Sequence, residues 1–234
     1  MKKISIIVPV FNEEKSLKKL FQKLLNLKFN NNKKEIVAVN DGSTDNSFNI
    51  LKKFKKIKIL NQRNQGKGKA VQSGISNATG DYVVIQDSDL EYSPKDMVRM
   101  YKAIKNLKKI SIYGSRYLPL RFGFIPKYYK GQNLSSYVAN IVFIFLFFLL
   151  YQRLITDPLT GYKLYEKKFF KNNSIKSKGF EADHEITAKL IKSNYKIIEI
   201  PINYNPRTRA EGKKINFFDG LKAIYTIIMY RIFN

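Results

Sequence analysis

An apolar run turns abruptly acidic in the stretch VIQDSDLEYSP, residues 84–94. The apolar part predicts the end of a buried strand, and Asp87, Asp89 and Glu91 follow at every second position. Alternate residues of an extended chain point the same way, so the three carboxylates are expected to converge. Their repulsion predicts a bound Mg²⁺ or Mn²⁺, because these ions prefer oxygen ligands and share them with phosphates. A solvated turn that caps the next helix is the alternative.

Strands and helices alternate through the first half of the chain. Buried strands are expected at residues 4–11, 35–40, 57–60, 82–86 and 110–115. Short apolar strands separated by helices predict an α/β fold, with a mostly parallel sheet and helices on both faces. Ligands of such open sheets bind beyond the carboxyl ends of the strands. The polar residues that follow these strands are therefore expected to share one crevice.

The composition favours an anionic partner. The 234 residues carry 43 Lys and Arg against 18 Asp and Glu, a formal charge of +25. Nucleic acid, an anionic membrane surface and a phosphorylated substrate all fit this excess. The alternative is an A/T-biased genome that drifts solvated positions toward Lys and accounts for part of the charge. The basic residues are dispersed and form no nucleic-acid-binding motif, so nucleic acid is the remote alternative. The chain has no Cys, which excludes disulfides and thiolate metal sites.

Two apolar segments raise the question of a membrane. Residues 131–152 carry no charge, and residues 139–151 are almost wholly apolar. This core is short for a bilayer span, so a buried or interfacial helix is expected and a true span is the alternative. The C-terminal segment, residues 215–234, combines an apolar helical face with aromatic and basic flanks. Such a helix either lies in a membrane interface or docks on the sheet.

Four motifs in the first half carry a family resemblance. They are VPVFNEE (8–14), VNDGSTDNS (39–47), NQGKGKAVQSG (64–74) and QDSDLEYSP (86–94). In this order and spacing they resemble the inverting glycosyltransferases of family 2, which have the GT-A fold. Later segments resemble the branch that contains dolichyl-phosphate mannose synthase and bacterial polyprenyl-phosphate glycosyltransferases: GSRY (114–117), DPLTGYKLY (157–165), GFEADHEIT (179–187) and IPINYNPRTRAEGKKI (200–215).

The resemblance implies a single GT-A catalytic domain, a Rossmann-like nucleotide-diphospho-sugar transferase, over residues 1–234. Residues 1–115 would form the sugar-nucleotide-binding half and residues 116–204 the acceptor half. Residues 205–234 would add a basic loop and an amphipathic helix. The chain is expected at the cytoplasmic face of the membrane, either peripheral on an anionic surface or held by a membrane-anchored partner protein.

The resemblance also assigns the donor site. It implies that Pro9, Phe11 and Glu13 contact the nucleoside of a sugar nucleotide, and that Asp41 bonds to the base or ribose. Asp87 and Asp89 would hold the cation and the donor diphosphate, with Glu91 as a third metal ligand. The mannose synthases often have Gln at this third position. The Glu in this chain weakens a match to their donor.

The acceptor site is assigned in the same way. Arg116, Arg207 and Lys213 would bind the acceptor phosphate, and Lys130 is expected to join them. Asp157 would orient this site or the metal, and a purely structural role, such as capping Thr160-Gly161, is the alternative. The expected catalytic residues are Asp89, Arg116, Asp157 and Arg207.

The implied reaction moves a hexose from GDP-mannose or UDP-glucose to a dolichyl or undecaprenyl phosphate. The alternative acceptor is a sugar hydroxyl in cell-envelope polysaccharide. That acceptor needs a general base, and the candidates are Asp157, Asp183 and Glu185.

Overall fold

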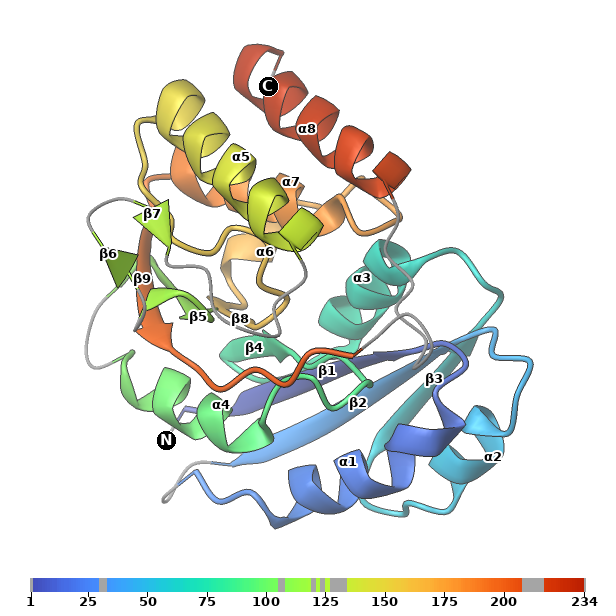
Figure 1. The fold of residues 1–234 in the computed structure, drawn as a ribbon. Helices are drawn as coiled ribbons and strands as arrows, with labels where there is room; N and C mark the ends of the chain where they lie inside the picture. The colour runs from blue at the N-terminus through green and yellow to red at the C-terminus, as the bar shows by residue number, and fades with distance from the viewer. Residues whose placement is uncertain are drawn as a thin grey trace.

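The structure, a computed structural model, describes residues 2–29, 33–104, 108–118, 134–207 and 217–233, and the backbone of 121–122 and 125–126 (Figure 1). Its strands are β1 (Ile4–Val10), β2 (Lys34–Asp41), β3 (Lys58–Gln62), β4 (Tyr82–Ile85), β5 (Ile110–Ser115), β6 (Arg121–Phe122), β7 (Ile125–Pro126), β8 (Lys163–Glu166) and β9 (Lys196–Pro201). Its helices are α1 (Glu14–Asn26), α2 (Ser47–Lys52), α3 (Lys67–Asn77), α4 (Pro94–Lys102), α5 (Leu134–Tyr151), α6 (Phe169–Asn172), α7 (Ala182–Lys192) and α8 (Phe217–Ile232).

The described strands build one seven-stranded sheet in the order β3-β2-β1-β4-β8-β5-β9, apart from the two-stranded β6-β7 ribbon. Neighbours among β1 to β4 pair in parallel, as do β5 and β9. β8 runs antiparallel to β4 and to β5, between which it lies. The predicted mostly parallel sheet is thus confirmed.

Helices cover both faces of this sheet, as the alternation of strands and helices predicts. Ile6 and Val8 of the fully buried β1 belong to a core shared with Leu17 of α1. Ile7 points to the other face and joins a core with Ala70 of α3. In Figure 1, α1 and α4 lie on one side of the sheet, and α3 and α7 on the other. The near-continuous apolar strands follow from this burial on two faces.

β8 is a strand that the sequence pattern did not predict. Its four residues, KLYE, are too few for a clear apolar period, and they begin and end with Lys163 and Glu166. The strand tolerates Lys163 because its ammonium donates to the carbonyl of Pro158, at 3.2 Å. The inserted strand brings residues 157–161 beside the end of β4, which gives the site a wall that the sequence did not predict.

The expectation that Asp87, Asp89 and Glu91 lie on an extended strand is wrong. β4 ends at Ile85, and the acids lie in a turn where Leu90 has a φ of 65°. The Asp89 Oδ1 atom accepts the N–H of Glu91 at 3.0 Å, which closes the turn. The three side chains therefore do not share one direction.

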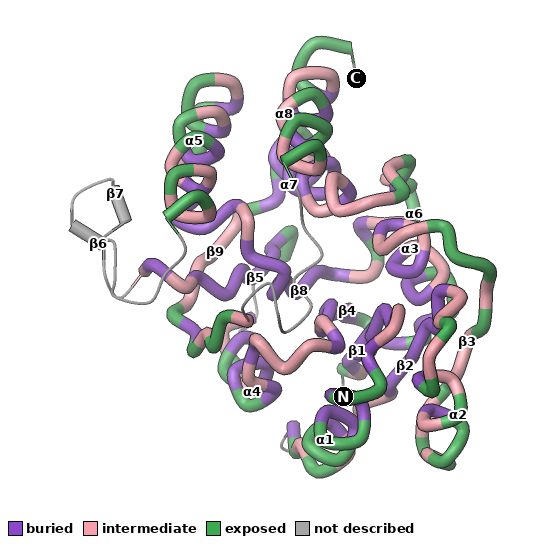
Figure 2. The backbone as a smooth tube through the Cα atoms, turned by 45° about the vertical axis from the view of Figure 1, so that its right-hand side comes forward, coloured by how far each residue is buried: buried purple, intermediate pink, exposed green. Residues whose placement is uncertain are grey.

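The two apolar helices, α5 and α8, lie side by side at one end of the molecule (Figures 1 and 2). The Tyr151 hydroxyl of α5 donates to the carbonyl of Ile227 in α8, at 2.8 Å. Among the helices described, α5 has the length and apolar composition to cross a membrane, yet only 28% of its residues are buried. Large apolar side chains stay exposed on both helices: Leu134, Val138, Val142, Phe145, Phe148, Leu149, Phe217, Phe218, Leu221 and Tyr225. Both helices thus dock on the domain through one face and leave another apolar face uncovered.

Candidate active site

The polar residues at the carboxyl ends of the strands open into one cavity of about 1360 Å³. The ends of β1, β2, β4 and β5 all contribute to its wall, as the strand-end argument predicts. The wall includes ten of the predicted site residues: Pro9, Phe11, Glu13, Asp41, Asp87, Asp89, Glu91, Arg116, Asp183 and Arg207. The cavity continues between the first turns of α5 and α8, so it joins the acidic strand end to the apolar helices.

Lys67 faces the first acid of the turn. Its ammonium lies 2.7 Å from Asp87 Oδ1 and 3.7 Å from Asp183 Oδ2, at the beginning of α3. Burial opposes the charge on Lys67, but Asp87 and Asp183 outweigh it, so the pKa of Lys67 lies above its usual value. Gly66, with a φ of 96°, permits the turn into α3, because a Cβ there would meet the Lys178 carbonyl at 2.6 Å.

Arg207 faces the second acid. Its guanidinium lies 3.0 Å from Glu13 Oε2 and 3.2 Å from Asp89 Oδ2. Burial lowers the pKa of Arg207, but the bond to Glu13 and the charge of Asp89 outweigh this effect and raise it. Arg207 therefore holds two site acids together from a segment more than a hundred residues away in the chain.

The Asp89 carboxyl lies close to two other acidic side chains. Burial, followed by the charges of Asp87 and Glu91, raises the pKa of Asp89 to about 7. The bond from the Glu91 N–H and the charge of Arg207 lower that pKa but do not offset the rise. At neutral pH this carboxyl is therefore poised between its protonated and charged forms.

Glu91 anchors the segment that carries Arg207. One carboxylate oxygen accepts the Tyr204 hydroxyl at 3.0 Å, and the other accepts the N–H of Arg207 at 2.8 Å. A backbone bridge between Tyr92 and Tyr204 adds to this link. Both oxygens of Glu91 thus already accept hydrogen bonds from the segment of residues 204–207.

Arg116 and Asp157 form a further ion pair at the cavity. The Nε and Nη2 atoms of Arg116 lie 2.7 Å from the two carboxylate oxygens of Asp157, a bidentate arrangement. Asp157 is fully buried. The guanidinium lies over the Tyr204 and Tyr117 rings, at 4.9 and 5.3 Å from their centroids. Asp157 thus fixes the direction of the Arg116 guanidinium, and its role in an acceptor site stays a prediction.

The predicted donor residues gather on the β1 and β2 side of the cavity. Pro9, Phe11 and Glu13 line it. The Asp41 carboxylate accepts the side-chain amide of Gln62 and the N–H groups of Gln65 and Gly66, at 2.7–3.0 Å. Asp41 therefore holds the glycine-rich loop, and its contact with a base or ribose stays a prediction.

Two predicted phosphate ligands, Lys130 and Lys213, lie outside the described residues. Two residues that contact the acids, Lys67 and Gly161, were not predicted from the sequence. Lys67 could have been suspected from its place in the glycine-rich loop. No sequence pattern marked Gly161 as a site residue. A Cβ at this position would meet Asp87 Oδ2 at 2.5 Å, so only glycine lets the 157–161 loop lie against this acid.

The acids fit a divalent cation in part. Within the described ranges, no three acidic or histidine side chains form a ready metal site, so the expected cluster of three carboxylates is not preassembled. Asp87 and Asp89 nevertheless both face the cavity, and each has a cationic side chain against it. Two carboxylates with this charge excess suit Mg²⁺ or Mn²⁺, which commonly take one or two carboxylates and complete their shell with phosphate oxygens and water.

The raised pKa of Asp89 predicts that metal binding depends on pH. Below pH 7 the carboxyl is mostly protonated, and a cation must displace that proton. We expect the apparent affinity for Mn²⁺ to fall by about tenfold between pH 8 and pH 6, measured by calorimetry. Asp89→Asn should bind Mn²⁺ more weakly and lose this dependence; a dependence that persists in the variant would assign the proton to another group.

The ion pair at Asp89 predicts that Arg207 competes with the cation. Arg207→Met keeps most of the side-chain length and removes the charge. We expect it to bind Mn²⁺ about fivefold more tightly, the size of a partly exposed ion pair. Arg153→Met removes the same charge from an exposed position after α5 and serves as the control. Equal affinities in the two variants would show that Arg207 does not oppose metal binding.

Comparison with known proteins identifies relatives over the whole chain. The model of the family described as glycosyl transferase family 2 matches residues 5–173. The UDP-N-acetylglucosamine–dolichyl-phosphate N-acetylglucosaminyltransferase of Methanococcus voltae is 29% identical, with 99% of this chain and 97% of that protein covered. The dolichol-phosphate mannosyltransferase of Pyrococcus furiosus is 30% identical, with 97% of this chain and 64% of that protein covered.

A solved structure shows the same fold. The glucosyl-3-phosphoglycerate synthase of Mycobacterium tuberculosis, crystallised with Mn²⁺, UDP and phosphoglyceric acid, superposes with a TM-score of 0.75. The alignment covers 100% of this chain and 80% of that one, at 15% identity. This likeness and the observed sheet confirm the predicted GT-A fold. The family match, over most of the chain, confirms the resemblance seen in the motifs: the chain is a glycosyltransferase and belongs to glycosyl transferase family 2.

Proposed function

We propose that the chain transfers a hexose from a nucleotide sugar to the phosphate of a polyprenyl phosphate. The observation that carries this proposal is the mixed lining of one cavity. Its wall combines the acids of the turn after β4, the cations Arg116 and Arg207, and apolar residues of α5 and α8. A lipid phosphate combines a charged head with an apolar chain in the same way.

The apolar end of the cavity suits a prenyl chain. Its wall includes apolar side chains from the first turns of both helices: Leu134, Val138, Val142, Phe217, Leu221 and Ile224. Leu134 and Phe217 are 63% and 77% exposed, so the groove opens directly at the surface. An exposed apolar groove of this kind is costly in water and favourable against lipid.

The names of the relatives agree on the class of acceptor but differ in the sugar that is transferred. Both carry dolichyl or dolichol phosphate in their names, but one is named for N-acetylglucosamine and the other for mannose. Matches of about 30% identity to two different transferases leave the donor to experiment. GDP-mannose, UDP-glucose and UDP-N-acetylglucosamine are the donors to test.

The proposed transfer requires positioning rather than deprotonation of the acceptor. A phosphate monoester is already anionic near neutral pH, so one of its oxygens can attack the anomeric carbon directly. The bond from that carbon to the donor diphosphate breaks as the new bond forms, with inversion. Arg116, fixed by Asp157, and Arg207 would hold the acceptor phosphate. A divalent cation held by Asp87 and Asp89 would offset the charge that develops on the leaving diphosphate.

Arg207 has to change partners in this scheme. Its guanidinium contacts Glu13 and Asp89 in the structure. A cation bound to Asp89 would neutralise the carboxylate that attracts Arg207. The guanidinium could then bind the acceptor phosphate. The donor and its cation would then bind before the lipid.

A sugar hydroxyl remains the alternative acceptor, and one observation favours it. Asp183 lines the cavity and could serve as the general base that a hydroxyl needs. The other two candidates are held more closely than Asp183, whose Oδ2 atom lies 3.7 Å from the Lys67 ammonium. Asp157 is buried against Arg116, and Glu185 is buried and accepts the N–H groups of Lys176 and Ser177. A water-soluble product would support this alternative.

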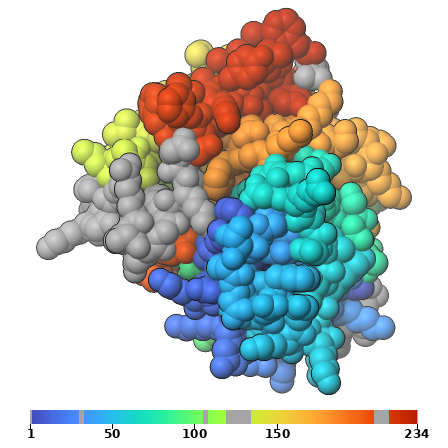
Figure 3. Space-filling model, turned by 90° about the vertical axis from the view of Figure 1, so that its right-hand side faces the viewer, coloured from blue at the N-terminus to red at the C-terminus, as the bar shows by residue number. Residues whose placement is uncertain are grey.

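The uncovered faces of α5 and α8 would lie on the membrane, at its cytoplasmic face. Lys222 and Arg231 are exposed on α8 and could reach lipid head groups. The lysine-rich α1 lies at the other end of the molecule: Figure 3 shows α8 (red) at one end and the N-terminal segments (blue to cyan) at the other. Apolar contact, more than the net charge, thus supports membrane binding here.

The lipid acceptor predicts a product that partitions into organic solvent. Purified protein would be incubated with Mn²⁺, polyprenyl phosphate and each labelled donor in turn. We expect organic-phase label from one donor, and Asp89→Asn should reduce it at least about a hundredfold, because the carboxylate contacts the cation and diphosphate. Asp81→Asn, an exposed acid at the opposite end of β4, is the control. Label confined to the water phase would favour the hydroxyl acceptor.

The exposed apolar faces predict binding to vesicles. Phe218 and Tyr225 are 70% and 64% exposed and do not line the cavity, so their replacement should cost little folding stability. We expect Phe218→Asp with Tyr225→Asp to weaken sedimentation with phosphatidylcholine–phosphatidylglycerol vesicles by at least about tenfold. Phe218→Leu with Tyr225→Phe should bind as the unmodified chain does. Equal sedimentation of all three proteins would contradict this orientation.

A further inference from the structure

The Arg116–Asp157 pair rests on a second carboxylate that does not reach the cavity. Glu199 of β9 accepts hydrogen bonds from three groups: the N–H of Asp157, and the N–H and hydroxyl of the preceding Thr156. Its Oε1 atom accepts the Thr156 and Asp157 N–H groups, each at 3.0 Å, and the Thr156 hydroxyl at 2.8 Å. Its Oε2 atom also lies 2.8 Å from the Thr156 nitrogen. Glu199 thus fixes the backbone that carries Asp157.

The same backbone is braced from two other elements. The Thr156 hydroxyl lies 2.8 Å from the hydroxyl of Ser115, the residue before Arg116. The buried Asn140 of α5 donates to the Thr156 carbonyl at 3.0 Å. The N–H of Arg116 itself bonds to Asp157 Oδ2 at 2.9 Å. Thr156 therefore joins the end of β5, β9 and α5 at one point behind the guanidinium.

We propose that Glu199 is a positioning residue for the reaction: by holding Thr156 and Asp157, it sets the direction of the Arg116 guanidinium at the cavity. Small errors in such a direction matter, because a displacement of about 1 Å at a reacting group can cost about a hundredfold in rate. The proposal rests on the proposed function for its kinetic test, since that function gives Arg116 the acceptor phosphate.

A loop clamp with no role in the site is the competing explanation, and the chain provides a matched control for it. Glu35 of β2 holds a loop in the same manner at the opposite end of the sheet. Its carboxylate accepts the Thr79 and Gly80 N–H groups, the Thr79 hydroxyl at 2.8 Å, and the hydroxyl of Ser5. Glu35→Ala and Glu199→Ala thus remove similar clamps, but only Glu199 lies behind Arg116.

The kinetic experiment separates the acceptor from the donor. Glu199→Ala should raise KM for polyprenyl phosphate by about 10- to 100-fold. KM for the donor and Kd for Mn²⁺ should stay within about twofold, because Arg116 is the group affected. Glu199→Gln should restore most of the loss, since its amide oxygen can accept the same N–H groups. Glu35→Ala should lower Tm and leave the acceptor KM unchanged.

A double-mutant cycle tests whether Glu199 acts through Arg116. In an Arg116→Ala background, Glu199→Ala should add little further loss of kcat/KM for the acceptor. Fully additive losses in the cycle, or an acceptor KM that is raised in Arg116→Ala but unchanged in Glu199→Ala, would overturn the proposal.

A spectroscopic measurement requires no assumption about the acceptor. The Nε–H signal of Arg116 in arginine-labelled protein reports its bond to Asp157. It should shift or broaden in Glu199→Ala and remain in Glu199→Gln and Glu35→Ala; an unchanged signal in Glu199→Ala would overturn the proposal. If Arg116→Ala leaves the acceptor KM unchanged while the signal responds as expected, the proposed acceptor site fails and the positioning of Arg116 by Glu199 stands.

Discussion

Acids that are largely shielded from water are tolerated at the strand ends because basic side chains from distant segments face them. Lys67 pairs with Asp87, and Arg207 pairs with Glu13 and Asp89. A carboxylate removed from water without such a partner costs several kcal/mol, so these pairs are a condition for the site to fold. They also connect α3 and the segment after β9 to β4. The acidic turn is therefore both the centre of the site and a junction of the fold.

In the predicted acceptor half, charges are also compensated by pairing, but the positions of the cations and the acids are exchanged. There the cation faces the cavity, and the acids lie behind it: Asp157 holds Arg116, and Glu199 holds the backbone of Asp157. Each half thus contains its own compensating charge. In the proposed function, a cation or a phosphate that binds would displace or join one of these ion pairs. The same cavity could then accept charged ligands of both signs.

Local pattern was enough to predict most of the sheet, and the strand-end rule was enough to predict which residues share the cavity. The parts that failed depend on contacts between distant residues. β8 could not be recognised from its own residues, because the hydrogen bond that accommodates Lys163 goes to the Pro158 carbonyl. Glycine is required at position 161 only because Asp87 lies against it. The acidic turn was misjudged because the bond from Glu91 to Asp89, not the strand period, sets its shape.

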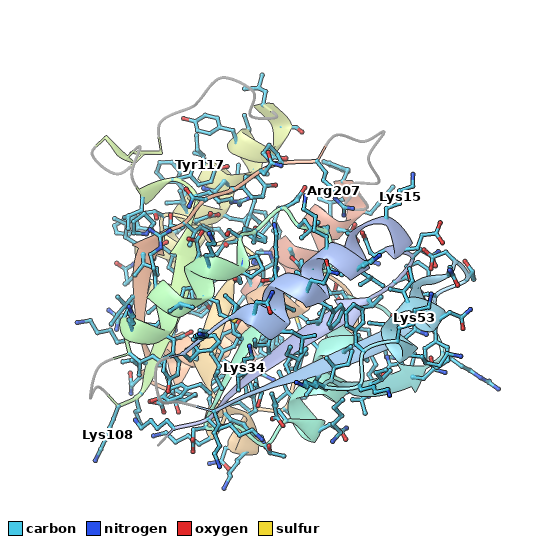
Figure 4. The ribbon with its side chains drawn as sticks, turned by 90° about the horizontal axis from the view of Figure 1, so that it is seen from below. Lys15, Lys34, Lys53, Lys108, Tyr117 and Arg207 are labelled. Atoms are coloured by element: carbon cyan, nitrogen blue, oxygen red, sulfur yellow. The ribbon has the colours of Figure 1, made fainter. Side chains whose placement is uncertain are left out.

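The net charge of +25 illustrates the same limit. Many lysines have no part in the cavity: Lys34 donates to carbonyls at the end of α1, and Lys34 and Lys108 lie far from Arg207 (Figure 4). The cations that meet the cavity are few, shielded from water and already paired. Two of them are arginines, whose planar groups can hold a carboxylate and still offer N–H groups to a phosphate. Burial and pairing, which no residue count contains, therefore determine which positive charges can act on a substrate.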